Sequence, residues 1–236
     1  GFQPFFYRKC NMVYNNIKSG RFISRPNRFI ANIEIDGEIC VCHVKNTGRC
    51  AELLLPGAHV FVQCCDNPNR KTKYDLIAVY KGERLINIDS QAPNKVFGEW
   101  IESYFKNVTY VKPEAKYKNS RFDFYIEADE RKIFAEVKGV TLENDGEVKF
   151  PDAPTLRGVK HLNELSDCIS EGFEAYVFFI VQMKDVKYFS PNRKTHPEFA
   201  AALEKALENG VNVCCVDCNV SPDSLTVGDF VPVKIT

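Results

Sequence analysis

The sequence predicts an α/β chain, α+β overall, in which a five-stranded β-barrel of the OB type precedes a mixed α/β domain. Two patterns predict this division. From about residue 21 to residue 88, short alternating stretches of polar and apolar residues are separated by close turns. From residue 89 onward, helices with one apolar face alternate with strands. With 236 residues and 44% hydrophobic side chains, the chain can bury the cores that two domains need.

The barrel is predicted from its turns. Asp36-Gly37 is a strong hairpin signal, and Pro56-Gly57 and Lys81-Gly82 mark two further turns. The expected strands cover residues 29–35, 38–44, 59–65, 72–80 and 84–88. Their number and spacing suit an OB barrel, although an SH3-like barrel would give much the same pattern. This domain is expected over residues 12–88, and residues 1–11, which lack the pattern of the rest, are interpreted as an extension.

The second domain, residues 89–236, is predicted to have the element order αβββαβαβ. Its first helix places Val96, Phe97 and Ile101 on one apolar face, and its second helix turns an apolar face inward that includes Leu156 and Leu162. The expected helices are 93–105, 155–171 and 197–208, and the expected strands are 109–117, 121–127, 132–139, 174–182 and 211–216. The strand at 174–182 is apolar almost throughout, as expected for a strand that is covered on both faces.

Composition excludes several classes of protein. No apolar run approaches about 18 residues, so no membrane span is expected. The 31 basic and 31 acidic residues give no net charge, so a polyanion would need a local basic patch. The ten cysteines, in a chain with ordinary cores, indicate reduced thiols and a cytoplasmic protein. Cys215-x-x-Cys218 resembles half of a zinc site, but no clear second pair accompanies it.

Residues 121–139, RFDFYIEADERKIFAEVKG, predict a hairpin that carries charges among core residues. If Asp129 and Glu130 form a two-residue turn, Asp123 falls directly opposite Glu136 on one face, with Cβ atoms about 5 Å apart. Lys138 follows about 7 Å along the same face. Opposed carboxylates repel each other unless a cation lies between them.

A divalent cation gives this arrangement a chemical use. Mg²⁺ accepts one or two protein carboxylates and keeps waters for phosphate substrates. Two acids and a lysine around Mg²⁺ or Mn²⁺ would make a site that cleaves phosphodiester bonds. The alternative is a solvated sheet face with ordinary charges, because a lone Glu-x-Lys motif is very common.

Five segments taken together resemble one known family. They are NTGRCAELLLPGAHV (46–60), NRKTKYDL (69–76), SRFDF (120–124), EVKGVTL (136–142) and FPDAPTLRGVKHLNEL (150–165). In this order they are similar to the sugar fermentation stimulation protein A family, over nearly everything from Met12 on. The resemblance implies an N-terminal OB domain, a C-terminal restriction-endonuclease-like domain of the PD-(D/E)XK fold, and DNA binding. The family name implies a regulatory role in bacterial sugar use.

The nuclease pattern carries over to particular residues of this chain. The resemblance implies that Asp123 and Glu136 bind the metal and that Lys138 completes the Glu-x-Lys pair. It also implies a further acid from the preceding helix, which would be Glu99; by periodicity alone Glu99 could equally be plain helix surface. Glu114 is the alternative fourth acid, and its other interpretation is a surface charge.

Basic residues interleave with aromatic residues in the barrel and suggest a surface for DNA. On an OB barrel such residues could follow phosphates and stack bases; equally, the aromatics could be core and the charges solvated. The candidates are Arg21, Arg25, Arg28, Lys45, Arg49, Arg70, Lys71 and Lys73.

The second helix adds further candidates. Asp152 is expected to cap this helix near Thr155, and Arg157 and Lys160 on its early turns would suit a phosphate. His161 could carry a proton, although a lone histidine is more often structural. Gln182, late in the buried strand, could face the same cleft.

Three functions remain open from the sequence. They are a Mg²⁺- or Mn²⁺-dependent nuclease acting on DNA, a DNA-binding regulator of sugar metabolism that uses the nuclease fold as a scaffold, and a protein-interaction module without a nucleic acid partner. The intact set of Asp123, Glu136 and Lys138 favours the nuclease. The oligomeric state is open, with a homodimer as one option.

Overall fold

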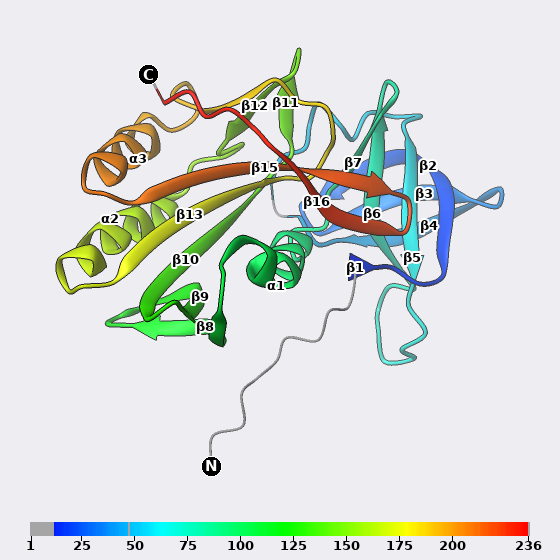
Figure 1. The fold of residues 1–236 in the computed structure, drawn as a ribbon. Coiled ribbons are helices and arrows are strands. Elements are labelled where there is room, and N and C mark those ends of the chain that lie inside the picture. The colour runs from blue at the N-terminus through cyan, green and yellow to red at the C-terminus, as the bar shows by residue number, and fades with distance from the viewer. Residues whose placement is uncertain (1–11, 47, 236) are drawn as a thin grey trace.

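The computed structural model describes residues 12–46 and 48–235, and the expected extension, residues 1–11, lies outside the described part. A β-barrel lies beside an α/β domain (Figure 1). The barrel strands are β2 (Ile17–Asn27), β3 (Ile30–Ile35), β4 (Glu38–Val44), β5 (His59–Cys64) and β6 (Tyr74–Lys81), with β7 (Arg84–Asn87) paired to β6.

Five strands close the barrel. The sheet has the order β4-β3-β2-β5-β6-β7, and an additional parallel pairing of β4 with β6 joins its ends. The prediction of a five-stranded OB-type barrel is confirmed, but its membership differs. The strand at 84–88 lies outside the closed ring, and β2 was not expected. Two register shifts against β3 interrupt β2, so its sequence lacks the clean alternation that marks a strand.

The second domain is built on a seven-stranded sheet with the order β1-β16-β15-β13-β10-β9-β8. Its strands are β1 (Met12–Val13), β8 (Val108–Tyr117), β9 (Ser120–Ala128), β10 (Arg131–Val140), β13 (Glu174–Val181), β15 (Asn212–Ser221) and β16 (Ser224–Phe230). The central strands β10, β13 and β15 are parallel, and the outer pairings are antiparallel. A small second sheet holds β11 (Leu142–Asn144), β12 (Glu147–Phe150) and β14 (Tyr188–Pro191).

Helices cover both faces of the large sheet. On one face lies α1 (Ala92–Tyr104), whose buried Phe97 packs against Phe124 of β9 and Phe178 of β13. The other face carries α2 (Leu156–Ser170) and α3 (Pro197–Glu208) (Figure 1). Leu156 was predicted to point inward and is 81% exposed. It is the first residue of α2, and the buried face of this helix begins at Gly158.

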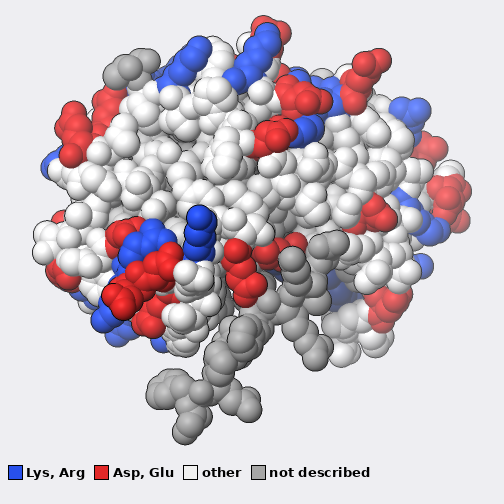
Figure 2. Space-filling view, viewed as in Figure 1, with Lys and Arg blue, Asp and Glu red and all other residues white. Residues whose placement is uncertain are grey.

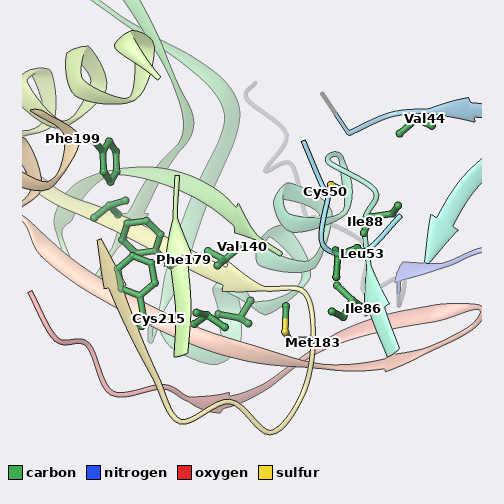
Figure 3. Close-up of a cluster of buried hydrophobic side chains, with 14 of the residues drawn as sticks. Val44, Cys50, Leu53, Ile86, Ile88, Val140, Phe179, Met183, Phe199 and Cys215 are labelled. Carbon is green, nitrogen blue, oxygen red and sulfur yellow. The ribbon is translucent and has the colours of Figure 1, made fainter. Parts of the chain in front are cut away.

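The two domains share one continuous apolar core. Figure 3 shows buried side chains that run from Val44 and Leu53 of the barrel to Phe179 and Phe199 of the α/β domain. Polar contacts reinforce this junction. The buried Gln182 side chain donates to Asn87 Oδ1 at 2.9 Å and to the Asp89 carbonyl at 3.0 Å. The barrel is therefore fixed against the α/β domain rather than tethered by a linker.

A barrel loop adds a second connection between the domains. The Arg25 guanidinium donates to four backbone carbonyls, those of Arg28, Asn46, Gly48 and Arg49. The Arg49 backbone N–H in turn donates to Asp152 Oδ2 at 3.0 Å. Asp152 thus holds the barrel loop and does not cap α2.

The cap of α2 is Thr155. Its Oγ1 accepts the Gly158 N–H at 3.0 Å, which satisfies one of the free backbone donors of the first turn. The prediction that Asp152 caps this helix is wrong, because the carboxylate has a backbone donor on the barrel instead.

None of the nine cysteines in the described part of the chain forms a disulfide. Cys215 and Cys218 pack into separate core clusters on opposite faces of β15, so they do not form half of a zinc site. No described helix is long and apolar enough to cross a membrane.

Candidate active site

The hairpin of β9 and β10 carries the candidate carboxylates. Its turn residues, Asp129 and Glu130, both have positive φ, 49° and 65°, as a type I′ turn requires. The strands then pair as predicted, with Ile126 opposite Ile133 and Phe124 opposite Ala135. The predicted register is confirmed over this length, although Asp-Glu is not a favoured turn sequence.

The recorded pairing ends at Phe124 and Ala135, one position before the two carboxylates. Beyond it, Asp123 Oδ2 accepts the backbone N–H of Val137 at 2.8 Å, so a side chain replaces the main-chain acceptor of β9. Asp123 Oδ1 accepts from Asn94 Nδ2 of α1 at 2.9 Å. Helix α1 and strand β10 together fix this carboxylate where the two strands separate.

Glu136 is almost completely buried, with 2% of its surface exposed. Its Oε1 lies 2.5 Å from Lys138 Nζ and 2.5 Å from His161 Nδ1 of α2. Its Oε2 is buried and has no hydrogen-bond partner within the described chain. A buried carboxylate oxygen without a donor is costly, so Oε2 is the atom of this site that most needs a ligand.

The electrostatics of the two carboxylates differ. Burial raises the pKa of Asp123, and the negative charge of Glu136 raises it further. Burial would also raise the pKa of Glu136, but the hydrogen bond from His161 and the charge of Lys138 outweigh burial, and this pKa lies below its usual value. The repulsion between the two carboxylates therefore appears mainly as the raised pKa of Asp123, and a bound cation would relieve this repulsion.

The residues fit a divalent cation of the Mg²⁺ type. Among residues 12–46 and 48–235, no group of three or more His, Cys, Asp or Glu side chains is arranged to hold a metal ion. Asp123 and Glu136 offer two carboxylates, which suits an ion that keeps most of its water shell. The unpartnered Oε2 of Glu136 is the first candidate ligand.

Glu99 makes no hydrogen bond to Asp123 or Glu136 in the described part of the chain. Its Oε2 accepts the backbone N–H of Met12 in β1 at 3.0 Å, and burial raises its pKa. The α1 residue that reaches Asp123 is Asn94, which no pattern in the sequence singles out. The helical pattern located the apolar face of α1 but could not say which polar residue would meet the end of β9.

The other candidates near the hairpin are dispersed. Glu114 is exposed on β8 and lies 3.4 Å from Arg121, consistent with a surface charge. Gln182 is used at the domain junction, yet it also lines a cavity of about 170 Å³ together with Gly139, the neighbour of Lys138. His161, which the sequence left open as either a proton carrier or a structural histidine, contacts Glu136 directly.

The basic candidates fall into two groups. Lys45 and Arg70 pair with the buried Asp75, Arg25 holds the loop at Asn46, and Arg21 donates to the Gly57 carbonyl. The exposed candidates are Arg28, Arg49, Lys71 and Lys73, together with Arg157, which donates through Nε to His161, and Lys160, which lies 3.7 Å from Glu164. The face shown in Figure 2 mixes both signs of charge and carries no large basic patch.

Comparison with known proteins now identifies the family. One family model, described as the sugar fermentation stimulation protein RE domain, matches residues 91–224, and a second, the SfsA N-terminal OB domain, matches residues 23–88. The chain belongs to the sugar fermentation stimulation family. A homolog of this name from Clostridium beijerinckii is 64% identical over 224 residues, which cover 94% of this chain and 99% of the homolog.

Other members of the family are also similar over their whole length. A homolog from Desulfitobacterium hafniense is 61% identical over 225 residues, covering 95% of this chain and 99% of its own. A solved structure of Pyrococcus furiosus SfsA in complex with Ca²⁺ superposes with a TM-score of 0.86 at 27% identity, covering 95% and 99% of the two chains.

Proposed function

We propose that this protein is a nuclease that cleaves phosphodiester bonds in DNA with Mg²⁺ or Mn²⁺. The observation that carries the proposal is the buried Glu136 oxygen without a donor, next to a second carboxylate, Asp123, whose pKa is raised. The Ca²⁺ complex of the Pyrococcus furiosus relative supports divalent-cation binding in this family.

Each residue of the site has a distinct role in the proposal. Asp123 and Glu136 would hold the cation, with Asn94 and the Val137 N–H keeping the Asp123 carboxylate in place. Lys138, whose side chain is 15% exposed, is close enough to hold a water or a phosphate oxygen beside Glu136. When bound, the cation would activate water and offset the charge that develops on the phosphate.

DNA would be held through local positive charge. Because the chain has no net charge, binding depends on exposed cations, of which Arg157 and Lys160 stand on the same helix as His161. Arg28, stacked 4.6 Å over the ring of Phe29, offers a cation and an aromatic face on the barrel. Such binding should weaken steeply with added salt.

A second function, a DNA-binding regulator of sugar metabolism without catalysis, is favoured by one observation. Lys138 and His161 both contact Glu136 Oε1, so groups of the protein itself can balance the buried charge of this carboxylate. The family name is consistent with a regulatory role.

One assay separates the two functions. Supercoiled and single-stranded DNA are incubated with Mg²⁺ or Mn²⁺ and wild-type protein, Asp123→Ala, Glu136→Ala, or Asp167→Ala as an exposed control on α2. We expect cleavage by the wild type and the control and none by the two site variants. Binding without cleavage in either metal supports the regulator, and absence of binding at low salt contradicts both functions.

A further inference from the structure

The contacts of His161 go beyond what a packed core histidine needs. The residue is 3% exposed and its ring meets Phe122 edge-on, as a structural histidine would. Both of its ring nitrogens, however, have charged partners on opposite sides. Nδ1 lies 2.5 Å from Glu136 Oε1, and Nε2 lies 3.3 Å from Arg157 Nε. The imidazole therefore bridges a buried carboxylate and an exposed guanidinium.

The chemistry of Arg157 fixes the direction of both hydrogen bonds. A guanidinium nitrogen donates and cannot accept, so Nε2 of His161 must offer its lone pair. The ring proton then sits on Nδ1 and is donated to Glu136 Oε1. A neutral imidazole with its proton on Nδ1 therefore satisfies the hydrogen bonds of His161, Glu136 and Arg157 together.

This chain of contacts orients the metal-facing carboxylate. Because His161 and Lys138 both bind Oε1, the Glu136 side chain cannot rotate without losing two donors. Its Oε2 is thereby left as the free oxygen. Groups that hold a ligating side chain from behind in this way typically change metal affinity by about 10- to 100-fold when removed.

We infer that His161 is a positioning residue that presents Glu136 Oε2 to a divalent cation, and that Arg157 sets its tautomer. This inference rests on the proposed metal site. Arg157 uses Nε for His161, and among the residues that the structure describes its two terminal nitrogens have no hydrogen-bond partner, so they can hold a phosphate. A phosphate bound there would be linked through two side chains to the carboxylate that holds the cation.

The first test measures Mn²⁺ affinity by calorimetry for four variants. His161→Phe should weaken binding about 10- to 100-fold. His161→Asn should recover most of the loss, because an asparagine amide can place a donor near the position of Nδ1. Arg157→Met should weaken binding, whereas Lys160→Met should not, although both remove an exposed cation from α2. Loss of positive charge alone would strengthen binding of a cation in both, so the sign separates positioning from simple electrostatics.

The second test reads the ring directly in the metal-free protein. Nitrogen NMR of histidine-labelled protein, with four histidines assigned through the His161→Asn spectrum, should report the Nδ1–H tautomer for His161. The Nε2–H tautomer would overturn the inference. So would unchanged Mn²⁺ affinity in His161→Phe when Glu136→Gln has lost binding, a result that leaves the proposed function standing. If the wild type binds no Mn²⁺, the metal site itself fails and His161 has no cation to position.

Discussion

The Asp123 carboxylate accepts the backbone N–H of Val137 at 2.8 Å, and this bond marks the point at which β9 and β10 separate. Here an acidic side chain accepts a backbone N–H of β10, whereas elsewhere in the hairpin a backbone carbonyl of β9 accepts it. The carboxylate is thus fixed by the sheet itself, next to Glu136 and close enough for the two charges to interact.

Asp123→Asn should stabilise the metal-free protein at neutral pH. The folded pKa of Asp123 lies above its unfolded value, so its ionisation lowers stability as pH rises through that window. Asparagine keeps an acceptor for Val137 without the charge. With EDTA, we expect Tm to exceed that of the wild type by a few degrees at pH 7.5, and the gain to shrink towards pH 4. Asp167→Asn, exposed on α2, should show no such gain, and a lower Tm for Asp123→Asn at pH 7.5 would show that the charge of Asp123 does not destabilise the fold.

Asn94→Ala should weaken binding of a divalent cation more than Glu99→Gln does. Asn94 donates to Asp123 Oδ1, whereas the recorded partner of Glu99 is the Met12 N–H. Loss of a hydrogen bond behind a metal ligand should cost about tenfold in Mn²⁺ affinity. Titration of both variants checks this. A larger loss in Glu99→Gln would show that α1 serves the site as the family resemblance implies, through Glu99.

Arg25→Met and Arg28→Met should separate stability from DNA binding. The Arg25 guanidinium donates to four carbonyls, and its removal should destabilise the protein by about 2 kcal/mol or more. Arg28 is exposed over Phe29, so its loss should leave Tm nearly unchanged and weaken DNA binding. Thermal unfolding and fluorescence anisotropy at low salt measure the two effects. Equal Tm values for the two variants would refute the assignment.

Gly48→Ala should disturb the contact between the barrel loop and Asp152. A Cβ at Gly48 would lie 2.2 Å from Asp152 Oδ2, too close unless that carboxylate moves. Asp152→Ala removes both the clash and the acceptor of the Arg49 N–H. The double variant should therefore lose less stability than the sum of the single losses. Additive losses in thermal unfolding would mean that the two residues do not interact.

The sequence could predict most strands, but it could not predict which side chains of the helices contact them. Alternation specified the register of β9 against β10, because one slip would have turned Ile133 and Phe124 out of the core. The β11–β12 hairpin was missed even though Asp145-Gly146 is a turn signal, because its strands are only three and four residues long. Periodicity shows which face of a helix is apolar, but the partner of a polar residue depends on how helix and sheet pack. Asn94 and the Glu136 contact of His161 could therefore be found only in three dimensions.

In the proposed site, Asp123 and Glu136 together bind one divalent cation. Isothermal titration of Mn²⁺ into the wild type, Asp123→Asn, Glu136→Gln and Glu102→Gln, an exposed control on α1, tests it most directly. We expect one site in the wild type and the control, with binding lost in both site variants. Binding that persists in Asp123→Asn and Glu136→Gln, or no binding in the wild type, would contradict it.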